Sequence, residues 1–142
     1  MFWIIRIDSY ALLAYFQAEL AGMKVRDILK DCLSNHGTAY LLVISLGEIY
    51  YIIARKMEKK SADANLEDIY SLPVELIDLT KERVLAAARI KAHYAVSYAD
   101  AFVIAAAVEY SAIITTGYPE FKETESLACV LWLDSPGENK IG

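Results

Sequence analysis

The sequence predicts an α/β protein, a three-layer α/β/α sandwich with a mainly parallel central sheet of about five strands. Short runs of apolar, β-branched residues alternate along the chain with runs whose apolar residues recur at helical spacing. The strand runs are apolar throughout, which is typical of strands covered by helices on both faces. Hydrophobic residues make up 56% of the chain, above the roughly 45–50% of an average domain, and this excess agrees with a core on each face of the sheet.

The first part of the chain reads as strand, helix, helix. A strand is expected at 2–7, where the first apolar run stops at Asp8. Residues 11–16 have helical character, and residues 25–32 place apolar side chains at the i, i+3, i+4 and i+7 positions of an amphipathic helix. The Asn-His-Gly sequence at 35–37 ends that helix, because Asn and Gly readily adopt the left-handed conformation that follows a helix.

The middle of the chain continues the alternation. A second strand is expected at 39–44, and Ser45 is a plausible N-cap for a helix at 46–60. A further helix is expected at 61–70, beginning with a serine, and a third strand at 72–79.

Two later helices carry local capping signals. Thr80 is expected to cap a helix at 81–94, and Ser97 a helix at 98–110, because a hydroxyl at the N-cap accepts a hydrogen bond from an early helical N–H. The last two strands are expected at 112–116 and 127–133.

The length of 142 residues fits one domain, and no linker rich in Pro, Gly or Ser divides it. We expect a single domain at 1–134 and a mobile C-terminal tail at 135–142. No run reaches the roughly 18 uncharged apolar residues that a membrane span needs, so neither an anchor nor a signal peptide is expected. Cys32 and Cys129 lack the close spacing of a zinc or redox motif and lie in apolar segments, which predicts reduced core residues in a cytoplasmic protein.

The formal net charge of −5 argues against a protein that coats nucleic acid electrostatically. Local basic clusters remain candidates for nucleic-acid contact, with a solvated helix face as the alternative for each. They are Arg55, Lys56, Lys59 and Lys60, and Arg83, Arg89 and Lys91.

Three carboxylates, Asp8, Glu48 and Asp100, each occur where an apolar run breaks off. Parallel sheets place their ligand sites beyond the carboxyl ends of the strands. Asp8 follows the first strand, Glu48 lies a turn into the helix after the second, and the turn at 117–120 follows the fourth. Asp100 joins them from the first turn of its helix if that helix starts over the same edge.

Each acid also has a structural alternative. Asp8 could only cap the next helix, Asp100 could form a capping box with Ser97, and Glu48 could lie on an exposed helix face. Together, however, three acids at one sheet edge raise one another's pKa unless a cation neutralises them. A hard, oxygen-seeking ion such as Mg²⁺ or Mn²⁺ meets that need.

Five segments in the same order carry a family resemblance: 7–16, 45–51, 72–75, 97–101 and 115–121. Over nearly its whole length the sequence resembles the PIN domain, in particular the small VapC-type toxins of toxin–antitoxin pairs. The resemblance implies a PIN-like fold, an RNA substrate, a cognate antitoxin and an Mg²⁺- or Mn²⁺-dependent endoribonuclease. The apolar excess further indicates a homodimer.

The resemblance also assigns roles to individual residues. Asp8, Glu48 and Asp100 would be catalytic and would bind the metal, while Ser9 stands where the family usually has a supporting Thr or Ser hydroxyl. Thr116 and Tyr118 are further supporting candidates. Metal ions can lower the pKa of a bound water and stabilise charge that develops on an attacked phosphate, so no nucleophilic side chain is required.

At Tyr118 the sequence departs from the family pattern, which usually has an acid at this position. A phenol with an ordinary pKa of about 10 is a poor ligand for a hard cation, so the site loses one negative charge. Three alternatives stay open. Glu120 could reach the metal, a single metal could suffice for a slower nuclease, or the domain could be a catalytically degenerate module that binds RNA or a partner.

Tyrosines also flank the acid motifs. The rings of Tyr10, Tyr98 and Tyr118 could stack on unpaired bases, each contributing about 1–3 kcal/mol, or they could pack within the protein. A nucleotide-binding α/β domain is disfavoured, because the sequence has no Gly-rich phosphate loop and no Walker-type lysine.

Overall fold

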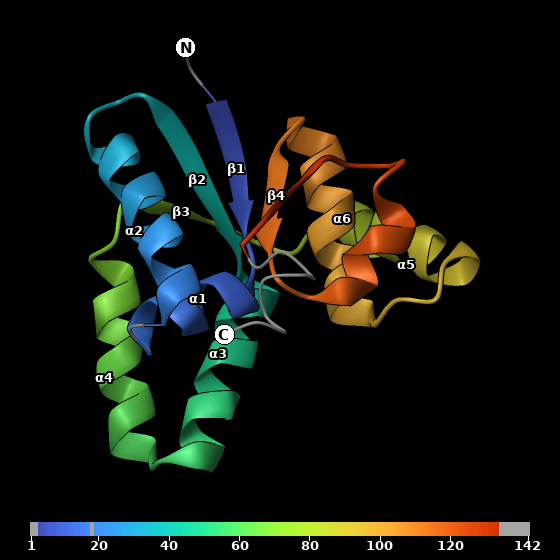
Figure 1. The fold of residues 1–142 in the computed structure, drawn as a ribbon. Coiled ribbons are helices and arrows are strands. Elements are labelled where there is room, and N and C mark those ends of the chain that lie inside the picture. Colours follow the sequence, from blue (N-terminus) through green and yellow to red (C-terminus); the bar gives the residue numbers. More distant parts are fainter. Residues whose placement is uncertain (1–2, 18, 134–142) are drawn as a thin grey trace.

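The computed structural model describes residues 3–17 and 19–133 (Figure 1). Its strands are β1 Trp3–Ile7, β2 Gly37–Leu42, β3 Val74–Ile77, β4 Ile113–Thr116 and β5 Val130–Trp132. Its helices are α1 Ser9–Phe16, α2 Leu20–Leu33, α3 Val43–Lys56, α4 Lys59–Tyr70, α5 Lys81–His93, α6 Tyr98–Tyr110 and the 3-10 helix η1 Pro119–Thr124.

The strands form one five-stranded sheet in the order β3-β2-β1-β4-β5, and all of its strand pairs are parallel. The chain moves from β1 outward to β3 and then returns to place β4 on the other side of β1. The strand order therefore reverses between β1 and β4, and a crevice at such a reversal is where doubly wound sheets bind their ligands. Ile7 pairs with Thr115, so Asp8 and Thr116 lie level with each other at the carboxyl end of the sheet.

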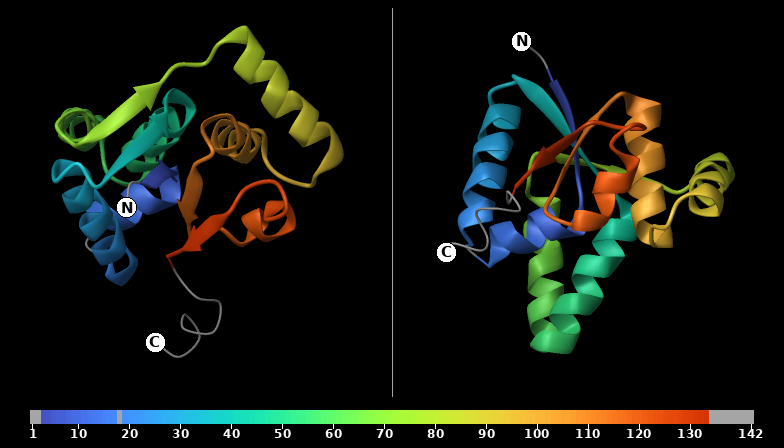
Figure 2. Two further views of the ribbon diagram at one scale, coloured as in Figure 1. Left: turned by 90° about the horizontal axis from the view of Figure 1, so that it is seen from above. Right: turned by 45° about the vertical axis from the view of Figure 1, so that its right-hand side comes forward.

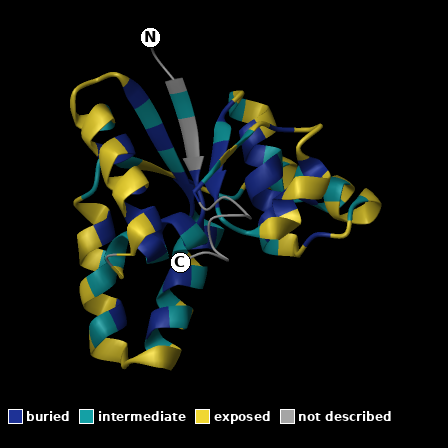
Figure 3. Ribbon diagram, in the orientation of Figure 1, coloured by how far each residue is buried: buried dark blue, intermediate teal, exposed yellow. Residues whose placement is uncertain are grey.

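Helices cover both faces of the sheet (Figure 2). One apolar core packs α1 to α4 against one face, and a second core packs α5, α6 and η1 against the other. Buried residues line the strands and the inward sides of the helices, while the outer helix surfaces are exposed (Figure 3). This arrangement confirms the predicted three-layer α/β/α sandwich with a parallel sheet.

Two predicted helix caps are confirmed and one is wrong. The hydroxyls of Thr80 and Ser97 accept hydrogen bonds of 3.2 and 3.1 Å from backbone N–H groups three residues later. Ser45 is not a cap, because α3 already begins at Val43 with Leu42 as its N-cap, and Ser45 is fully buried. The apolar run passes from β2 into α3 without a break, so hydropathy does not mark this boundary.

Smaller differences concern element ends. Helix α4 begins at Lys59 rather than at residue 61, and β3 and β5 are shorter than predicted. The turn expected after β4 leads into η1, with Pro119 in its first turn. Cys129 is exposed and Cys32 is only partly buried, so the expectation of two core cysteines is wrong.

None of the described helices combines the length and the apolar character needed to cross a lipid bilayer. The mobile tail predicted at 135–142, and Phe2 in the first predicted strand, lie outside the described residues.

Candidate active site

Asp8 occupies the junction between β1 and α1, where it is only 2% exposed. As the N-cap of α1 it accepts a 3.0 Å hydrogen bond at Oδ1 from the backbone N–H of Ala11. Its other oxygen, Oδ2, accepts a 2.5 Å hydrogen bond from the Thr116 hydroxyl at the end of β4. The capping role anticipated as an alternative is therefore real, and it fixes the carboxylate at the sheet edge.

Burial dominates the electrostatics of Asp8 and raises its pKa to about 7. The hydrogen bonds from Thr116 and Ala11 lower the pKa, while the charges of Asp100 and Glu48 raise it further. Asp8 is therefore a carboxylate that is expensive to ionise in the absence of a neighbouring positive charge.

Glu48 lies in the second turn of α3 and is half-buried. Its Oε1 accepts a 3.3 Å hydrogen bond from the hydroxyl of Ser9, in the first turn of α1. Burial raises the pKa of Glu48, the Ser9 hydrogen bond lowers it, and the charge of Asp100 raises it again. Glu48 is thus directed at the other acids rather than lying on a free helix face.

Asp100 lies in the first turn of α6, and its backbone N–H donates to the Ser97 hydroxyl. The side chain is mostly buried, and burial raises its pKa, which a hydrogen bond with Ser97 lowers. Glu120, an exposed residue in the first turn of η1, is close enough for its charge to raise the pKa of Asp100 as well. Ser97 thus caps the backbone N–H of Asp100, and the charge of Asp100 acts on both Asp8 and Glu48.

Tyr118 points into this group of acids. Its backbone N–H donates a 3.1 Å hydrogen bond to the Thr116 hydroxyl, and its ring packs edge-on against Tyr10 with centroids 5.0 Å apart. Burial raises the pKa of the Tyr118 phenol, a hydrogen bond with Ser9 lowers it, and the charges of the three candidate acids, Asp8, Glu48 and Asp100, raise it again. The phenol therefore lies close enough to all three carboxylates for their charges to act on it.

The donor set suits a hard divalent cation by its chemistry, because the candidate ligands are carboxylate oxygens whose negative charges repel one another. Among the side chains that the structure describes, no Lys or Arg forms an ion pair with Asp8, Glu48 or Asp100. In the same residues, no three acidic, histidine or cysteine side chains lie close enough together to hold one ion. The residue types fit a metal ion, and their side chains would have to move toward one another to share it.

Two contacts in the site were not anticipated from the sequence. Thr116 was expected only to support the site, and it bonds directly to Asp8. A Cβ atom at Gly117 would overlap the outer end of the Tyr10 ring, so a side chain at this position would displace that ring. The glycine at this position was the signal in the sequence that could have indicated the close approach of the Tyr10 ring.

Of the three candidate stacking tyrosines, Tyr98 is the most accessible at 45% exposure, and it stacks on Phe102 with centroids 4.9 Å apart.

A family model for the PIN domain matches residues 5–126. Among solved structures, VapBC2 from Rickettsia felis bound to a DNA fragment from its promoter has a TM-score of 0.72 at 15% identity, covering 92% of this chain and 99% of that chain. VapC20 from Mycobacterium tuberculosis, described as a sarcin-ricin loop cleaving toxin, has a TM-score of 0.68 at 17% identity, covering 84% and 94%. FitAcB from Neisseria gonorrhoeae has a TM-score of 0.66 at 15% identity, covering 91% and 97%. At these identities the likeness establishes a shared fold, and no curated protein matches the chain.

Proposed function

The chain belongs to the PIN domain family, and from that membership we propose that it is a metal-dependent endoribonuclease that hydrolyses RNA phosphodiester bonds as the toxin of a toxin–antitoxin pair. The observation that carries this proposal is the buried carboxylate of Asp8, with a pKa of about 7, beside the charges of Asp100 and Glu48. A buried acid of this kind is a common mark of a functional site. The description of the M. tuberculosis VapC20 structure as a loop-cleaving toxin supports the same class of activity.

Asp8, Glu48 and Asp100 would hold the Mg²⁺ or Mn²⁺ ion, with Glu120 as a further candidate ligand beside Asp100. Such an ion, when bound, supplies Lewis acidity that lowers the pKa of water and offsets charge on a phosphate. Thr116 and the α1 backbone hold the Asp8 carboxylate in one orientation, and Ser9 does the same for Glu48. These neutral hydrogen bonds orient the acids without cancelling the negative charge that a cation needs.

Tyr118 gives this site a property that an acid there would not have. Its raised pKa keeps the phenol protonated at neutral pH, so the hydroxyl can donate a hydrogen bond to a phosphate oxygen. The same neutral phenol adds no charge for a second cation. We therefore propose a nuclease that works with one tightly held ion and is slower than a relative with a fourth acid.

A second candidate function is a catalytically silent module that binds RNA or a protein partner. Two observations favour it: the Tyr118 phenol hydrogen bonds with Ser9 in the middle of the site, and three carboxylates do not converge on one point among the described residues. This alternative differs from the first only in chemistry, because the fold and the exposed surfaces would be the same.

An antitoxin is the proposed protein partner, since one similar structure is described as a toxin–antitoxin complex and another as a member of a family of toxin–antitoxin systems. A cavity of about 320 Å³ between α1, α3 and α4 is lined in part by Leu13, Phe16, Ile53 and Met57. In the described structure, the buried Oδ1 atom of Asn65 at this cavity has no hydrogen-bond partner. An antitoxin segment that placed apolar side chains in this cavity and one hydrogen-bond donor beside Asn65 would fill the cavity and pair the Oδ1 atom.

We also propose that the protein forms a homodimer and acts in the cytoplasm, where its RNA substrate would be. Leu85 on α5 and Val108 on α6 are 47% and 53% exposed, which favours association through this side of the molecule.

The proposal is tested by incubating structured RNAs with the purified protein in Mn²⁺ or Mg²⁺, alongside Asp8→Asn and Tyr118→Asp variants. Cleavage by the wild type that Asp8→Asn abolishes would support the nuclease. Cleavage by the Asp8→Asn variant at the same rate as the wild type would identify a contaminating nuclease. Cleavage that appears only in Tyr118→Asp would favour the silent module.

A further inference from the structure

The α3–α4 hairpin connects the candidate active site to a basic surface. Helix α3 starts at the carboxyl edge of the sheet, and with α4 it projects away from the rest of the molecule (Figures 1 and 2). The end of α3 and the start of α4 carry four basic side chains and one acid, all exposed, although the whole chain has a net charge of −5. The basic residues are Arg55, Lys56, Lys59 and Lys60, and the acid is Glu58. We refer to residues 55–60 as the basic tip.

One face of α3 links this basic tip to the site. Glu48, Tyr51 and Arg55 are three and then four residues apart, so they follow one another along the same helix face over about 10 Å. Tyr51 is 45% exposed, and the guanidinium carbon of Arg55 lies 5.0 Å from the centre of its ring. An accessible aromatic ring and a cation therefore lie together directly beyond a candidate metal ligand.

Contacts between the two helices hold this face in position. The Tyr50 hydroxyl donates a 2.7 Å hydrogen bond to Oδ1 of Asp63 on α4. Ile53, Ala62 and Ile69 are buried in the core that α3 and α4 share. The basic tip is thus fixed relative to Glu48 and does not depend on a loose loop for its placement.

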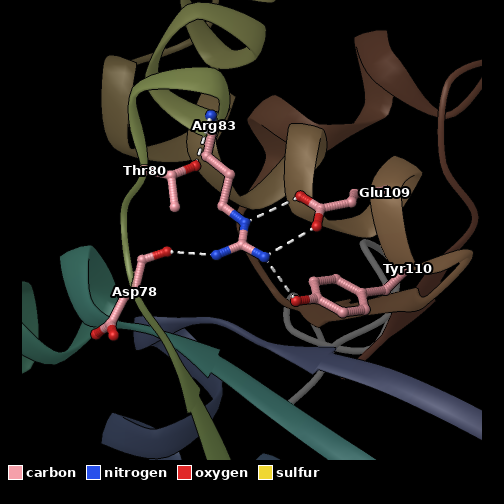
Figure 4. A network of polar contacts seen from close by, with 5 residues as sticks. All are labelled: Asp78, Thr80, Arg83, Glu109 and Tyr110. Carbon is pink, nitrogen blue, oxygen red and sulfur yellow. Dashed lines mark hydrogen bonds and ion pairs between the residues drawn. The ribbon is translucent and has the colours of Figure 1, made fainter.

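Two of the three residues in the other basic cluster that the sequence suggested, Arg83 and Lys91, are occupied by internal contacts. Arg83 donates two 3.0 Å hydrogen bonds to the carboxylate of Glu109, one of 2.9 Å to the carbonyl of Asp78 and one of 2.9 Å to the Tyr110 hydroxyl (Figure 4). Lys91 donates a 2.8 Å hydrogen bond to the carbonyl of Val96. These two cations join α5 to neighbouring segments, which leaves them less suited than the basic tip to bind phosphate.

Resting on the proposed nuclease function, we propose that the Tyr51–Arg55 face of α3 and the basic tip bind a single-stranded stretch of RNA next to the bond to be cut. Tyr51 stacks on an unpaired base, while Arg55 and the lysines contact successive phosphates. Aromatic rings beside a positively charged track are the usual means of binding single strands without reading their sequence. An unpaired substrate follows, because bases inside a duplex do not expose a face for Tyr51.

The test measures the affinity of a fluorescent single-stranded RNA for the Asp8→Asn protein, which keeps cleavage from interfering, and for the same protein with further substitutions. Tyr51→Leu, Arg55→Gln and the triple Lys56→Gln, Lys59→Gln, Lys60→Gln variant address the proposed surface. Arg89→Gln, an exposed cation on α5, is the matched control. Melting temperatures confirm that each variant is folded.

We expect Tyr51→Leu to weaken binding about 5-fold or more for the single strand and much less for a duplex of the same sequence. Arg55→Gln and the triple variant should weaken both, and each lost phosphate contact should reduce the slope of log affinity against log salt by about 0.7. Arg89→Gln should bind like its parent. Equal loss in Arg89→Gln, or unchanged RNA binding in the α3 variants, would overturn the proposal.

The same variants made in the wild-type background separate this inference from the proposed function. Normal RNA cleavage with unchanged binding in the α3 variants would refute the inference and leave the nuclease intact. Binding that depends on α3 in a protein that never cleaves RNA would uphold the inference and refute the nuclease.

Discussion

The hydroxyl of Thr116 donates a 2.5 Å hydrogen bond to Oδ2 of Asp8, across a separation of 108 residues in the sequence. This bond joins the end of β4 to the residue that follows β1, at the point where the strand order of the sheet reverses. The Thr116 hydroxyl also accepts a hydrogen bond from the backbone N–H of Tyr118. One buried threonine therefore links the most buried candidate ligand to the turn where the family acid is missing.

The raised pKa of Asp8 makes the stability of the metal-free protein depend on pH. Below about pH 4 Asp8 is protonated in both the folded and the unfolded chain; between about pH 4 and 7 only the folded chain keeps the proton, so stability falls as pH rises. Above pH 7 the ionised Asp8 lowers the free energy of unfolding by on the order of 4 kcal/mol, at 1.36 kcal/mol for each unit by which its pKa exceeds that of an unfolded carboxyl. Burial also raises the pKa of Glu48 and Asp100, which adds to the same trend.

Asp8→Asn isolates this contribution. We expect its melting temperature in chelator to fall less than that of the wild type as pH rises, and to exceed the wild-type value near neutral pH. Thermal melts of both proteins across this pH range measure the difference. Parallel curves would show that Asp8 ionises normally in the folded protein.

Thr116 and Thr115 provide a matched pair of buried hydroxyls. Both side chains are fully buried, but the Thr115 hydroxyl has no hydrogen-bond partner in the described structure. Thr116→Val should destabilise the protein by about 1–3 kcal/mol because it removes a donor to a buried carboxyl, whereas Thr115→Val should be neutral or stabilising. Urea unfolding of both variants measures the change in the free energy of unfolding. Equal changes in the two variants would show that the hydrogen bond from Thr116 to Asp8 does not stabilise the fold.

Tyr98 is expected to contact RNA more than it supports the fold. It is 45% exposed and stacks with one face on Phe102, and it opens α6 two residues before Asp100. Tyr98→Ala should weaken RNA binding by about 1–3 kcal/mol while the melting temperature changes little. A large drop in melting temperature with unchanged RNA affinity would assign the ring to packing instead.

Local signals in the sequence predicted local structure well. The caps at Thr80 and Ser97 depend on residues only three positions away, and both are present. Ser45 misled because the apolar run continues across the strand end, so the true start of α3 carries no polar marker. Asp8 and Glu48 could be placed near one edge because they follow parallel strands, which share their carboxyl ends. Asp100 joined them only on the condition that its helix starts over the same edge.

Long-range side-chain contacts were beyond the reach of the sequence. The Thr116 bond to Asp8 depends on the register of β1 against β4, which the pattern of apolar residues does not specify. The contact of the Tyr118 phenol with Ser9 depends on how the turn packs against Tyr10. The resemblance identified Tyr118 as the departure from the family, and the fold adds that its side chain points into the site.

Mn²⁺ binding near neutral pH, followed by calorimetry, tests most directly the claim that Asp8, Glu48 and Asp100 form one cation site. We predict that the wild type binds Mn²⁺ and that Asp8→Asn, Glu48→Gln and Asp100→Asn each weaken binding by about 10-fold or more, since even residues outside the ligand shell commonly have effects of that size. Glu67→Gln, an exposed acid on α4, should bind like the wild type. Equal Mn²⁺ affinity in the wild type and all three carboxylate variants would contradict the account.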